Sequence, residues 1–375
     1  MTCRLARENL EIRTDGTVSI CCISSFRVTD ATGAVMNIEQ GLDNILAQSS
    51  LEDYRTRLEQ GLATPECSAC WSTEQAGMHS KRMVENKRFG SREFKSTLTS
   101  LDLKLGNTCN LKCRSCSSFA STRYMAEEIA IYGRSYSKKT EWADESDVLM
   151  ELTALSDDIE YIEFSGGEPL LIKNQFKFIE QLVQSGISKN IRLQYHTNTT
   201  IFPEEHIETL NKFKSINIVL SIDNLEDQFE YMRYPAKWDV CLDNIEKFKS
   251  TGFDMGISHS ISALNVYYLP EFLAWAHENQ LATFINVIHN PFNFTQLSNN
   301  TKQGIVDKLN RSLPTDTKYQ VNPVTKENNW IASLMSQQQG NSNKEFLDKI
   351  ARVDSYRKQS YKDTFPEMYK LLNDN

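Results

Sequence analysis

From about residue 100 to residue 290, short apolar segments alternate with longer segments in which apolar residues recur every three or four positions. The short segments predict six strands, at Leu101–Leu105, Ile159–Phe164, Ile191–Tyr195, Ile216–Ile222, Asp254–His259 and Phe284–Ile288. The longer segments predict amphipathic helices, at Gln175–Ser185, Glu204–Phe213, Trp238–Lys249 and Leu269–Asn279. Repeated strand–helix units form parallel sheets, so we predict an α/β fold with a partial (β/α)6 TIM-like barrel.

The regions on either side of this repeat have different patterns. Leu10–Ile20 alternates around an Asp-Gly pair and predicts a β-hairpin, followed by helical segments at Leu42–Gln48 and Leu51–Gly61. The polar carboxy-terminal stretch predicts helices near 303–312, 328–337, 343–355 and 365–372. We therefore expect four parts: a small amino-terminal module at 1–75, a linker at 76–99, a core barrel at 100–295 and a helical extension at 296–375.

Composition and charge narrow the class of protein. The net charge of −8 argues against a general nucleic-acid binder, since no basic field would attract phosphates. No segment approaches the ~20 apolar residues of a membrane span, and no apolar stretch follows Met1 as in a signal peptide. We expect a cytoplasmic protein without membrane contact.

Eight of the nine cysteines lie in the first third of the chain. In a protein of the cytoplasm such grouping indicates metal or catalytic use, with disulfides as the alternative. Cys109, Cys113 and Cys116 follow the first predicted barrel strand. Three thiolates cannot ligate all four irons of a cubane cluster, so one iron would stay open to another ligand.

Polar residues follow the other predicted strands, at the edge where the functional loops of β/α barrels gather. Gly166-Gly167-Glu168-Pro169 follows the second strand. The remaining candidates after strands three to six are His196, Asn198, Ser221, Asp223, Asn265 and His289.

The cysteine loop, together with Gly-Gly-Glu-Pro after the second strand, resembles the radical S-adenosylmethionine (radical SAM) superfamily over about residues 100–295. The resemblance implies that Cys109, Cys113 and Cys116 hold a [4Fe–4S] cluster whose open iron binds SAM. Reductive cleavage of SAM would then give a 5′-deoxyadenosyl radical that abstracts a substrate hydrogen. The residues that it implies for SAM binding are Gly166, Gly167, Glu168, Asn198, Ser221, Asp223 and Asn265. One departure is Ser115, where the family usually has an aromatic residue.

Four further cysteines resemble the ligands of the auxiliary-cluster modules called SPASM and twitch: Cys3, Cys21, Cys67 and Cys70. The resemblance implies a second [4Fe–4S] cluster, although such modules usually follow the core instead of preceding it. The run from Val353 to Arg357 also resembles a segment of this group. From the residues alone, a four-cysteine zinc site is an alternative, and Cys22 could replace Cys21.

We interpret the chain as a radical SAM oxidoreductase that modifies a peptide or protein, supplied with electrons by a reductant such as flavodoxin or ferredoxin. The alternatives are a radical dehydrogenase of a small alcohol, sugar or nucleotide, a radical methyltransferase, and a non-enzymatic iron–sulfur electron carrier. His196, His259 and His289 are weak candidates for proton transfer at the substrate. Cys241 lies on a predicted helix and is assigned to packing.

Overall fold

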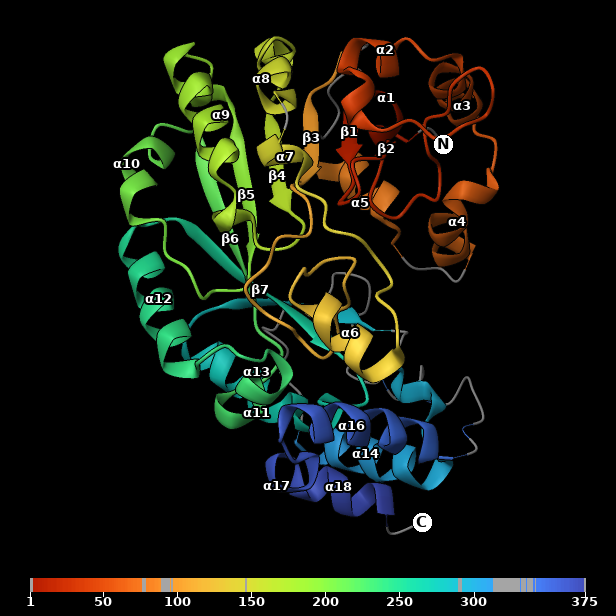
Figure 1. Cartoon of the computed structure of the whole chain (residues 1–375), viewed down its shortest axis with the longest axis vertical. Helices are drawn as coiled ribbons and strands as arrows, with labels where there is room; N and C mark the ends of the chain where they lie inside the picture. The colour runs from red at the N-terminus through yellow and green to blue at the C-terminus, as the bar shows by residue number, and fades with distance from the viewer. Residues whose placement is uncertain are drawn as a thin grey trace.

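The computed structural model describes residues 3–75, 79–88, 95, 97–145, 147–288, 292–312, 331, 335, 340 and 342–373. The described part is built on one eight-stranded sheet with the strand order β2-β1-β3-β4-β5-β6-β7-β8 (Figure 1). Every neighbouring pair from β1·β3 to β7·β8 is parallel, and only β1·β2 is antiparallel. The strands are β1 Asn9–Ile12, β2 Val18–Ser19, β3 Ser100–Lys104, β4 Tyr161–Ser165, β5 Arg192–Thr197, β6 Ser215–Ser221, β7 Asp254–Ile261 and β8 Ala282–Val287.

The sheet from β3 to β8 confirms the predicted α/β fold with a partial TIM-like barrel. All six predicted strands occur, and their ends differ from prediction by two residues or fewer. Burial alternates along β5 and β6, so that one face of each strand packs against helices. On β6 that face carries Ile216, Ile218 and Leu220.

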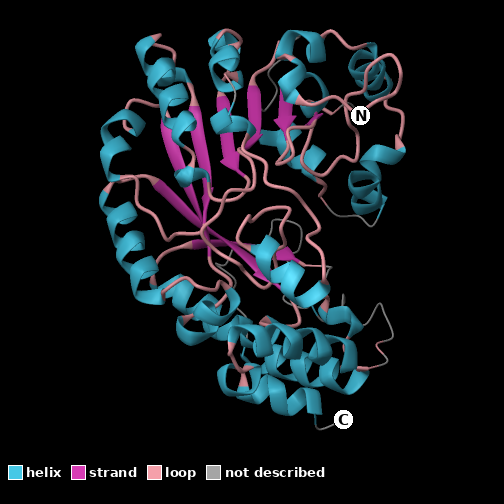
Figure 2. Ribbon diagram, viewed as in Figure 1, coloured by secondary structure: helices cyan, strands magenta, loops and turns pink. Residues whose placement is uncertain are grey.

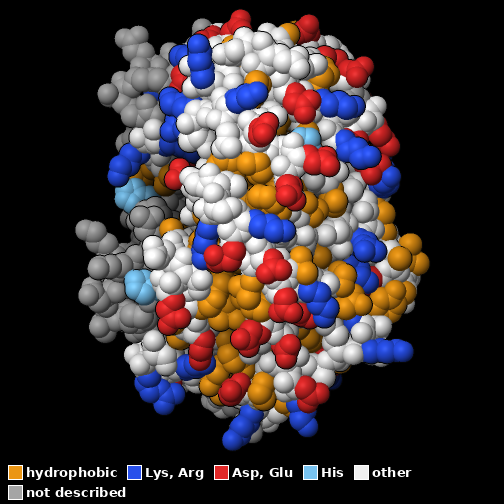
Figure 3. All heavy atoms as spheres, turned by 90° about the vertical axis from the view of Figure 1, so that its left-hand side faces the viewer, with side chains coloured by type: hydrophobic (Ala, Val, Ile, Leu, Met, Phe, Trp, Pro, Cys, Tyr) orange, Lys and Arg blue, Asp and Glu red, His pale blue; other side chains and the backbone are white. Residues whose placement is uncertain are grey.

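The outer face of the barrel is covered by helices that follow the strands (Figure 2). They include α9 Lys173–Gln184, α10 Ile207–Leu210, α12 Trp238–Ser250 and α13 Leu269–Glu278. The helix expected at 204–213 is shorter than predicted, because a 3-10 turn at Glu204–His206 precedes α10. Seen from outside, this face mixes both signs of charge with apolar side chains (Figure 3).

The amino-terminal hairpin extends the barrel sheet instead of forming a separate one. Its turn contains Gly16 with φ +79°, where a Cβ atom would lie 2.7 Å from the Asn37 side chain. β1 then pairs in parallel with β3, Asn9 opposite Ser100 and Ile12 opposite Leu103. The helices of this region are α1 Leu5–Glu8, α2 Leu42–Leu46, α3 Ser49–Glu59, α4 Ser68–Gln75 and α5 Lys81–Arg88.

The carboxy-terminal helices pack at the other end of the sheet, beside α6 Tyr124–Tyr132, α11 Glu226–Met232 and α13 (Figure 1). They are α14 Asn299–Ser312, α16 Lys344–Arg357, α17 Tyr361–Thr364 and α18 Pro366–Asn373. The helix predicted near 328–337 lies almost wholly outside the described residues. A continuous apolar core joins the amino-terminal region, the barrel and these helices. Among the described helices, none is long and apolar enough to cross a membrane.

Candidate functional site

The three-cysteine loop runs from the end of β3 toward α6. Burial raises the pKa of all three thiols, that of Cys116 to about 11. Neighbouring thiols raise the pKa of Cys113 and Cys116 further. Cys109 also lies 3.8 Å from the Asn198 side-chain amide. Three half-buried thiols on one short loop are suited to bind a metal cluster, which would replace their protons.

The Gly-Gly-Glu turn after β4 holds one side of this loop. Gly167 donates its backbone N–H to Gly106 over 3.0 Å, and Glu168 donates to Thr108 over 2.8 Å. A Cβ atom on Gly167 would lie only 2.1 Å from the Thr108 carbonyl oxygen. The glycine is therefore required for contact with the cysteine loop itself, in addition to any contact with SAM.

The segment after α11 holds the other side of the loop. Lys112 donates its backbone N–H to Tyr234 over 2.6 Å, and Arg114 donates to Met232 over 2.7 Å. Between these two contacts, the Arg233 guanidinium lies 3.9 Å from the Cys113 sulfur and 2.9 Å from Asp223. Burial disfavours the cation, but Asp223 and Cys113 raise the pKa of Arg233, so a positive charge is fixed beside the thiolates.

Arg233 is a site residue that the sequence reasoning missed. It lies more than a hundred positions after the cysteines and belongs to no motif named above. The geometry also gives Asp223 a definite role, because its second oxygen accepts from the Ser260 backbone N–H over 3.0 Å. Asp223 thus fixes Arg233 from the end of β6.

Glu168 is buried where the turn meets β5. Its carboxylate accepts hydrogen bonds from the Leu170 N–H at 3.1 Å, the Thr197 hydroxyl at 2.9 Å and the Asn198 N–H at 2.6 Å. Burial raises the pKa of Glu168 to about 7, against the effect of these donors. A carboxylate has about four acceptor positions, so one remains for a ligand's ammonium group.

The other predicted SAM contacts differ in how much bonding capacity they retain. Asn265 donates to the backbone oxygens of Asp223 at 2.6 Å and Ser260 at 3.0 Å, and its oxygen accepts from Ser262. Its amide is therefore used within the protein and positions the loops after β6 and β7. Ser221 ends β6 and is partly exposed. Their contacts with SAM stay predictions.

The three histidine candidates differ in which face of the sheet they occupy and in whether the structure describes them. His259 is on the helix-facing side of β7, where its ring stacks on Phe272 at 3.9 Å and contacts the Ile222 oxygen at 3.0 Å. Burial lowers the pKa of His259 to about 4, so the ring is neutral and packed in the wall. This geometry corrects the prediction of a catalytic role for His259. His289 lies outside the described residues.

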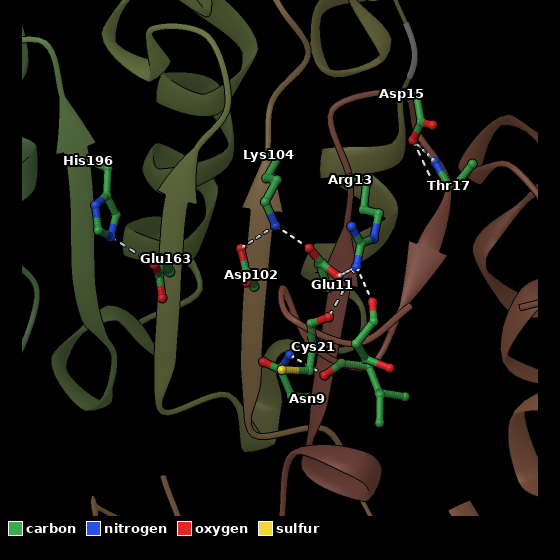
Figure 4. Close-up of polar contacts among 12 residues, drawn as sticks. Asn9, Glu11, Arg13, Asp15, Thr17, Cys21, Asp102, Lys104, Glu163 and His196 are labelled. Atoms are coloured by element: carbon green, nitrogen blue, oxygen red, sulfur yellow. Dashed lines mark hydrogen bonds and ion pairs between the residues drawn. The ribbon is translucent and has the colours of Figure 1, made fainter. Parts of the chain in front are cut away.

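His196 lies on the opposite, concave face of the sheet. Its Nε2 is 2.8 Å from Glu163 on β4 and 2.9 Å from Gln194. Burial opposes ionisation of Glu163, but the contact with His196 lowers the pKa of Glu163 to about 2. The His196–Glu163 pair therefore faces the interior of the barrel (Figure 4).

The pair belongs to a row of polar side chains that crosses the concave face (Figure 4). Strand register places Glu11, Asp102, Glu163, Gln194 and Asn217 opposite one another on β1, β3, β4, β5 and β6. Lys104 forms ion pairs with both Glu11 and Asp102. Burying charges is costly unless they are paired, so the pairing lets this inner face stay polar.

The row ends at the amino-terminal cysteines. Arg13 contacts Glu11 at 3.1 Å and donates to the backbone oxygens of Cys21 at 3.3 Å and Ser24 at 2.6 Å. The structure brings four cysteines to one pocket beyond this point, Cys3, Cys21, Cys67 and Cys70. Cys22 is not among the residues that line it, which favours Cys21 over its neighbour.

Within the described ranges, no three His, Cys, Asp or Glu side chains converge closely enough to hold one metal ion. The auxiliary pocket is otherwise mainly apolar, with Leu5, Ile20 and Trp71 among its lining residues.

Comparisons with known proteins agree with this geometry. An α/β barrel that combines a three-cysteine loop with a second pocket of cysteines is typical of an iron–sulfur protein. The family model of the Radical SAM superfamily matches residues 103–271, and that of the SPASM iron–sulfur cluster-binding domain matches residues 3–71. Residues 103–271 therefore match the radical SAM superfamily, and a match to the SPASM domain precedes them. The radical SAM match implies a [4Fe–4S] cluster and SAM as cofactors. The SPASM match implies additional iron–sulfur cluster binding.

Several solved structures are similar to this chain. "Native anSMEcpe with bound AdoMet" has a TM-score of 0.39 and 20% identity, and covers 52% of this chain and 52% of that chain. SuiB of Streptococcus suis has a TM-score of 0.41 and 15% identity over 81% of this chain and 58% of its own. The methyltransferase TsrM of Kitasatospora setae has a TM-score of 0.37 and 11% identity over 67% of this chain and 60% of its own.

The match with anSMEcpe spans only about half of that protein. No curated protein sequence matches the chain.

Proposed function

We propose that this protein is a radical SAM oxidoreductase that abstracts a hydrogen atom from a peptide or protein substrate. The observation that carries the proposal is the half-buried loop of Cys109, Cys113 and Cys116, which is held between the Gly-Gly-Glu turn and the segment that carries Arg233. The loop supplies three thiolates for a four-iron cluster, which leaves one iron for SAM. When bound, the cluster and SAM supply the one-electron chemistry that generates the 5′-deoxyadenosyl radical.

The residues around the loop have separable roles in this proposal. Cys109, Cys113 and Cys116 are the proposed cluster ligands, and Arg233 offsets their negative charge. Glu168 accepts a hydrogen bond from the ammonium group of SAM through its unused acceptor position. Gly166, Gly167 and Asn198 shape the same end of the pocket, while Asp223 and Asn265 hold Arg233 and the neighbouring loops in place.

The concave polar row is the proposed substrate surface. The partly exposed members of the row are the Glu163 carboxylate, the Gln194 and Asn217 amides and the His196 imidazole. They follow one another at strand spacing, so they can bind the N–H and C=O groups of a peptide. His196, oriented by Glu163 at 2.8 Å, is the group on this face that can accept a proton from the substrate. Cys3, Cys21, Cys67 and Cys70 are the proposed ligands of an auxiliary cluster that accepts the substrate's electron.

The same row favours one alternative, the radical dehydrogenation of a small polyhydroxylated molecule. Hydroxyl groups bind to carboxylates and amides as readily as peptide groups do. The two proposals differ in the substrate and share the radical chemistry. We also propose that the protein is cytoplasmic, because a reducing compartment keeps cysteines available as cluster ligands. The proposed parts of the chain are 1–75, 76–99, 100–295 and 296–375.

The test is anaerobic reconstitution with iron and sulfide, followed by reduction with dithionite and measurement of 5′-deoxyadenosine released from SAM. We expect release by the wild type and none by Cys113→Ala. Cys241→Ala is the matched control, because Cys241 is a packed residue of α12 that belongs to neither proposed ligand set and should keep the activity. Wild-type protein that binds a cluster and releases no 5′-deoxyadenosine would contradict the proposal.

A further inference from the structure

An exposed aromatic patch lies beside the cysteine loop and has no role in the chemistry proposed above. It begins at Phe119, three residues after Cys116, and continues along α6 and the turn that follows. We call it the α6 patch. Its members and their exposed fractions are Phe119 58%, Ile129 55%, Tyr132 41%, Tyr136 46% and Tyr356 45%. Large apolar side chains grouped in this way are typical of interaction sites.

One buried carboxylate holds the two ends of the patch together. Glu128 accepts from the Ser118 backbone N–H at 2.9 Å through one oxygen and from the Tyr136 backbone N–H at 2.9 Å through the other. The segment before α6, which carries Phe119, and the turn after α6, which carries Tyr136, are therefore both held by one side chain of the helix. The rings of Tyr132 and Tyr136 lie 6.0 Å apart, and α16 packs against α6 and brings Tyr356.

The exposed charges within the stretch that carries most of the patch are positive, although Lys139 is paired with Glu141 just beyond it. Between residues 117 and 140 the exposed charged residues are Arg123, Arg134, Lys138 and Lys139. The two acidic residues of this stretch, Glu127 and Glu128, are buried. The whole chain carries a net charge of −8, so this local excess of positive charge is distinctive. The outer helical face, in contrast, mixes both signs (Figure 3).

The patch also lies close to the proposed cluster. Three residues of extended chain span at most about 11 Å, which limits the separation of the Phe119 and Cys116 backbones. Arg123 donates to the Asn110 backbone oxygen over 3.4 Å, next to Cys109. A partner bound on the patch would therefore approach the cysteine loop.

We propose that the α6 patch is the docking site of an acidic one-electron carrier protein of the flavodoxin or ferredoxin type. This inference rests on the proposed function, because the cluster bound by Cys109, Cys113 and Cys116 has to receive one electron for each cleavage of SAM. The reduced carrier is oxidised by one electron and the cluster is reduced by one. A basic rim steers an acidic partner, and a small aromatic centre suits the limited interfaces of electron-transfer pairs.

The experiment compares two electron donors on the holoenzyme. The variants are Arg134→Glu with Lys138→Glu, and Phe119→Ala alone. The control is Lys173→Glu with Lys177→Glu on α9, which makes the same change of charge on the outer face. Formation of 5′-deoxyadenosine is measured with reduced flavodoxin and, separately, with dithionite. Binding of flavodoxin is measured directly by calorimetry at low and high salt.

With flavodoxin, we expect the charge-reversed variant to lose about tenfold or more in rate and affinity, while the α9 control keeps both. With dithionite, all variants should match the wild type. The proposal is overturned if the charge-reversed variant binds flavodoxin as the control does. It is equally overturned if, with dithionite as the donor, the charge-reversed variant matches the wild type without peptide but loses rate when peptide is added. The patch would then bind substrate instead of the electron carrier. Failure of the wild type with dithionite would refute the proposed function, and the binding measurement would still decide the docking site.

Discussion

Arg114, between the second and third cysteines of the loop, forms a buried ion pair with Asp354 of the carboxy-terminal helix α16. The Arg114 guanidinium also stacks on Tyr231 at 3.6 Å, and Asp354 accepts from the Tyr231 hydroxyl at 2.7 Å. Three residues further along α16, Arg357 pairs with Glu127 of α6 at 2.7 Å. The segment from Val353 to Arg357 therefore anchors the cysteine loop to the carboxy-terminal helices.

Asp354→Asn should weaken this anchor. Removal of one partner leaves the buried Arg114 charge without compensation, so we expect a loss of about 3 kcal/mol in the free energy of unfolding. Urea unfolding of the apoprotein measures the change. Glu345→Gln on the same helix removes only a surface pair with Lys349 and should leave the stability nearly unchanged. Equal effects of the two substitutions would show that the Arg114–Asp354 pair does not stabilise the fold.

The auxiliary pocket makes a prediction that separates two adjacent cysteines. Cys21→Ala should reduce the iron of the reconstituted protein by about four atoms per chain, the content of one cubane. Cys22→Ala should retain it, because Cys22 does not line the pocket. Iron and sulfide analysis, with zinc measured on the same samples, provides the comparison. Retention of iron in Cys21→Ala and its loss in Cys22→Ala would reverse the assignment.

Gly167→Ala tests the contact between the Gly-Gly-Glu turn and the cysteine loop. The added methyl group would meet the Thr108 carbonyl oxygen at 2.1 Å, and backbone cannot yield as a side chain can. We expect destabilisation of about 2 kcal/mol or more. Gly33→Ala is the control, since Gly33 has φ +85° with open space around it and should cost only about 1 kcal/mol of backbone strain. A smaller effect at Gly167 than at Gly33 would contradict this account.

His259 makes a prediction about pH. Its folded pKa of about 4 lies below the ordinary value of 6.5, so the unfolded state binds a proton first as the pH falls. The stability contributed by the neutral ring is present above pH 6.5 and is lost between about pH 6.5 and 4, to a total of about 3 kcal/mol. His259→Gln should flatten the stability profile in this window, measured by urea unfolding across pH. A profile as steep as that of the wild type would show that other groups cause the slope.

The sequence predicted the barrel well because its strands and helices have strong, regular apolar periods. Three strands, β4, β5 and β7, end later than predicted, because the extended backbone continues past the last predicted residue, as at Thr197 on β5. The orientation of His259 could also have been predicted. Ile257, His259 and Ile261 alternate with serines along β7, so the histidine shares the face that packs on helices.

Other features could not be obtained from local patterns. Arg233 reaches Cys113 only because the fold brings the segment after α11 against the cysteine loop. The row from Glu11 to Asn217 depends on the register of five strands. The strand order also places β1 beside β3, although Asn9 and its partner Ser100 are about ninety residues apart in the sequence. Long-range pairing of this kind leaves no periodic signal in the chain.

The parallel pairing of β1 with β3 has a consequence for how this protein can be divided. The SPASM hairpin supplies β1, the strand next to the first barrel strand β3. Cutting the chain after residue 75 would therefore leave unpaired backbone groups along β1 in one fragment and along β3 in the other. Neither fragment would be a self-sufficient unit. Exchange of this module between related enzymes would therefore require a matching strand as well as matching cysteines.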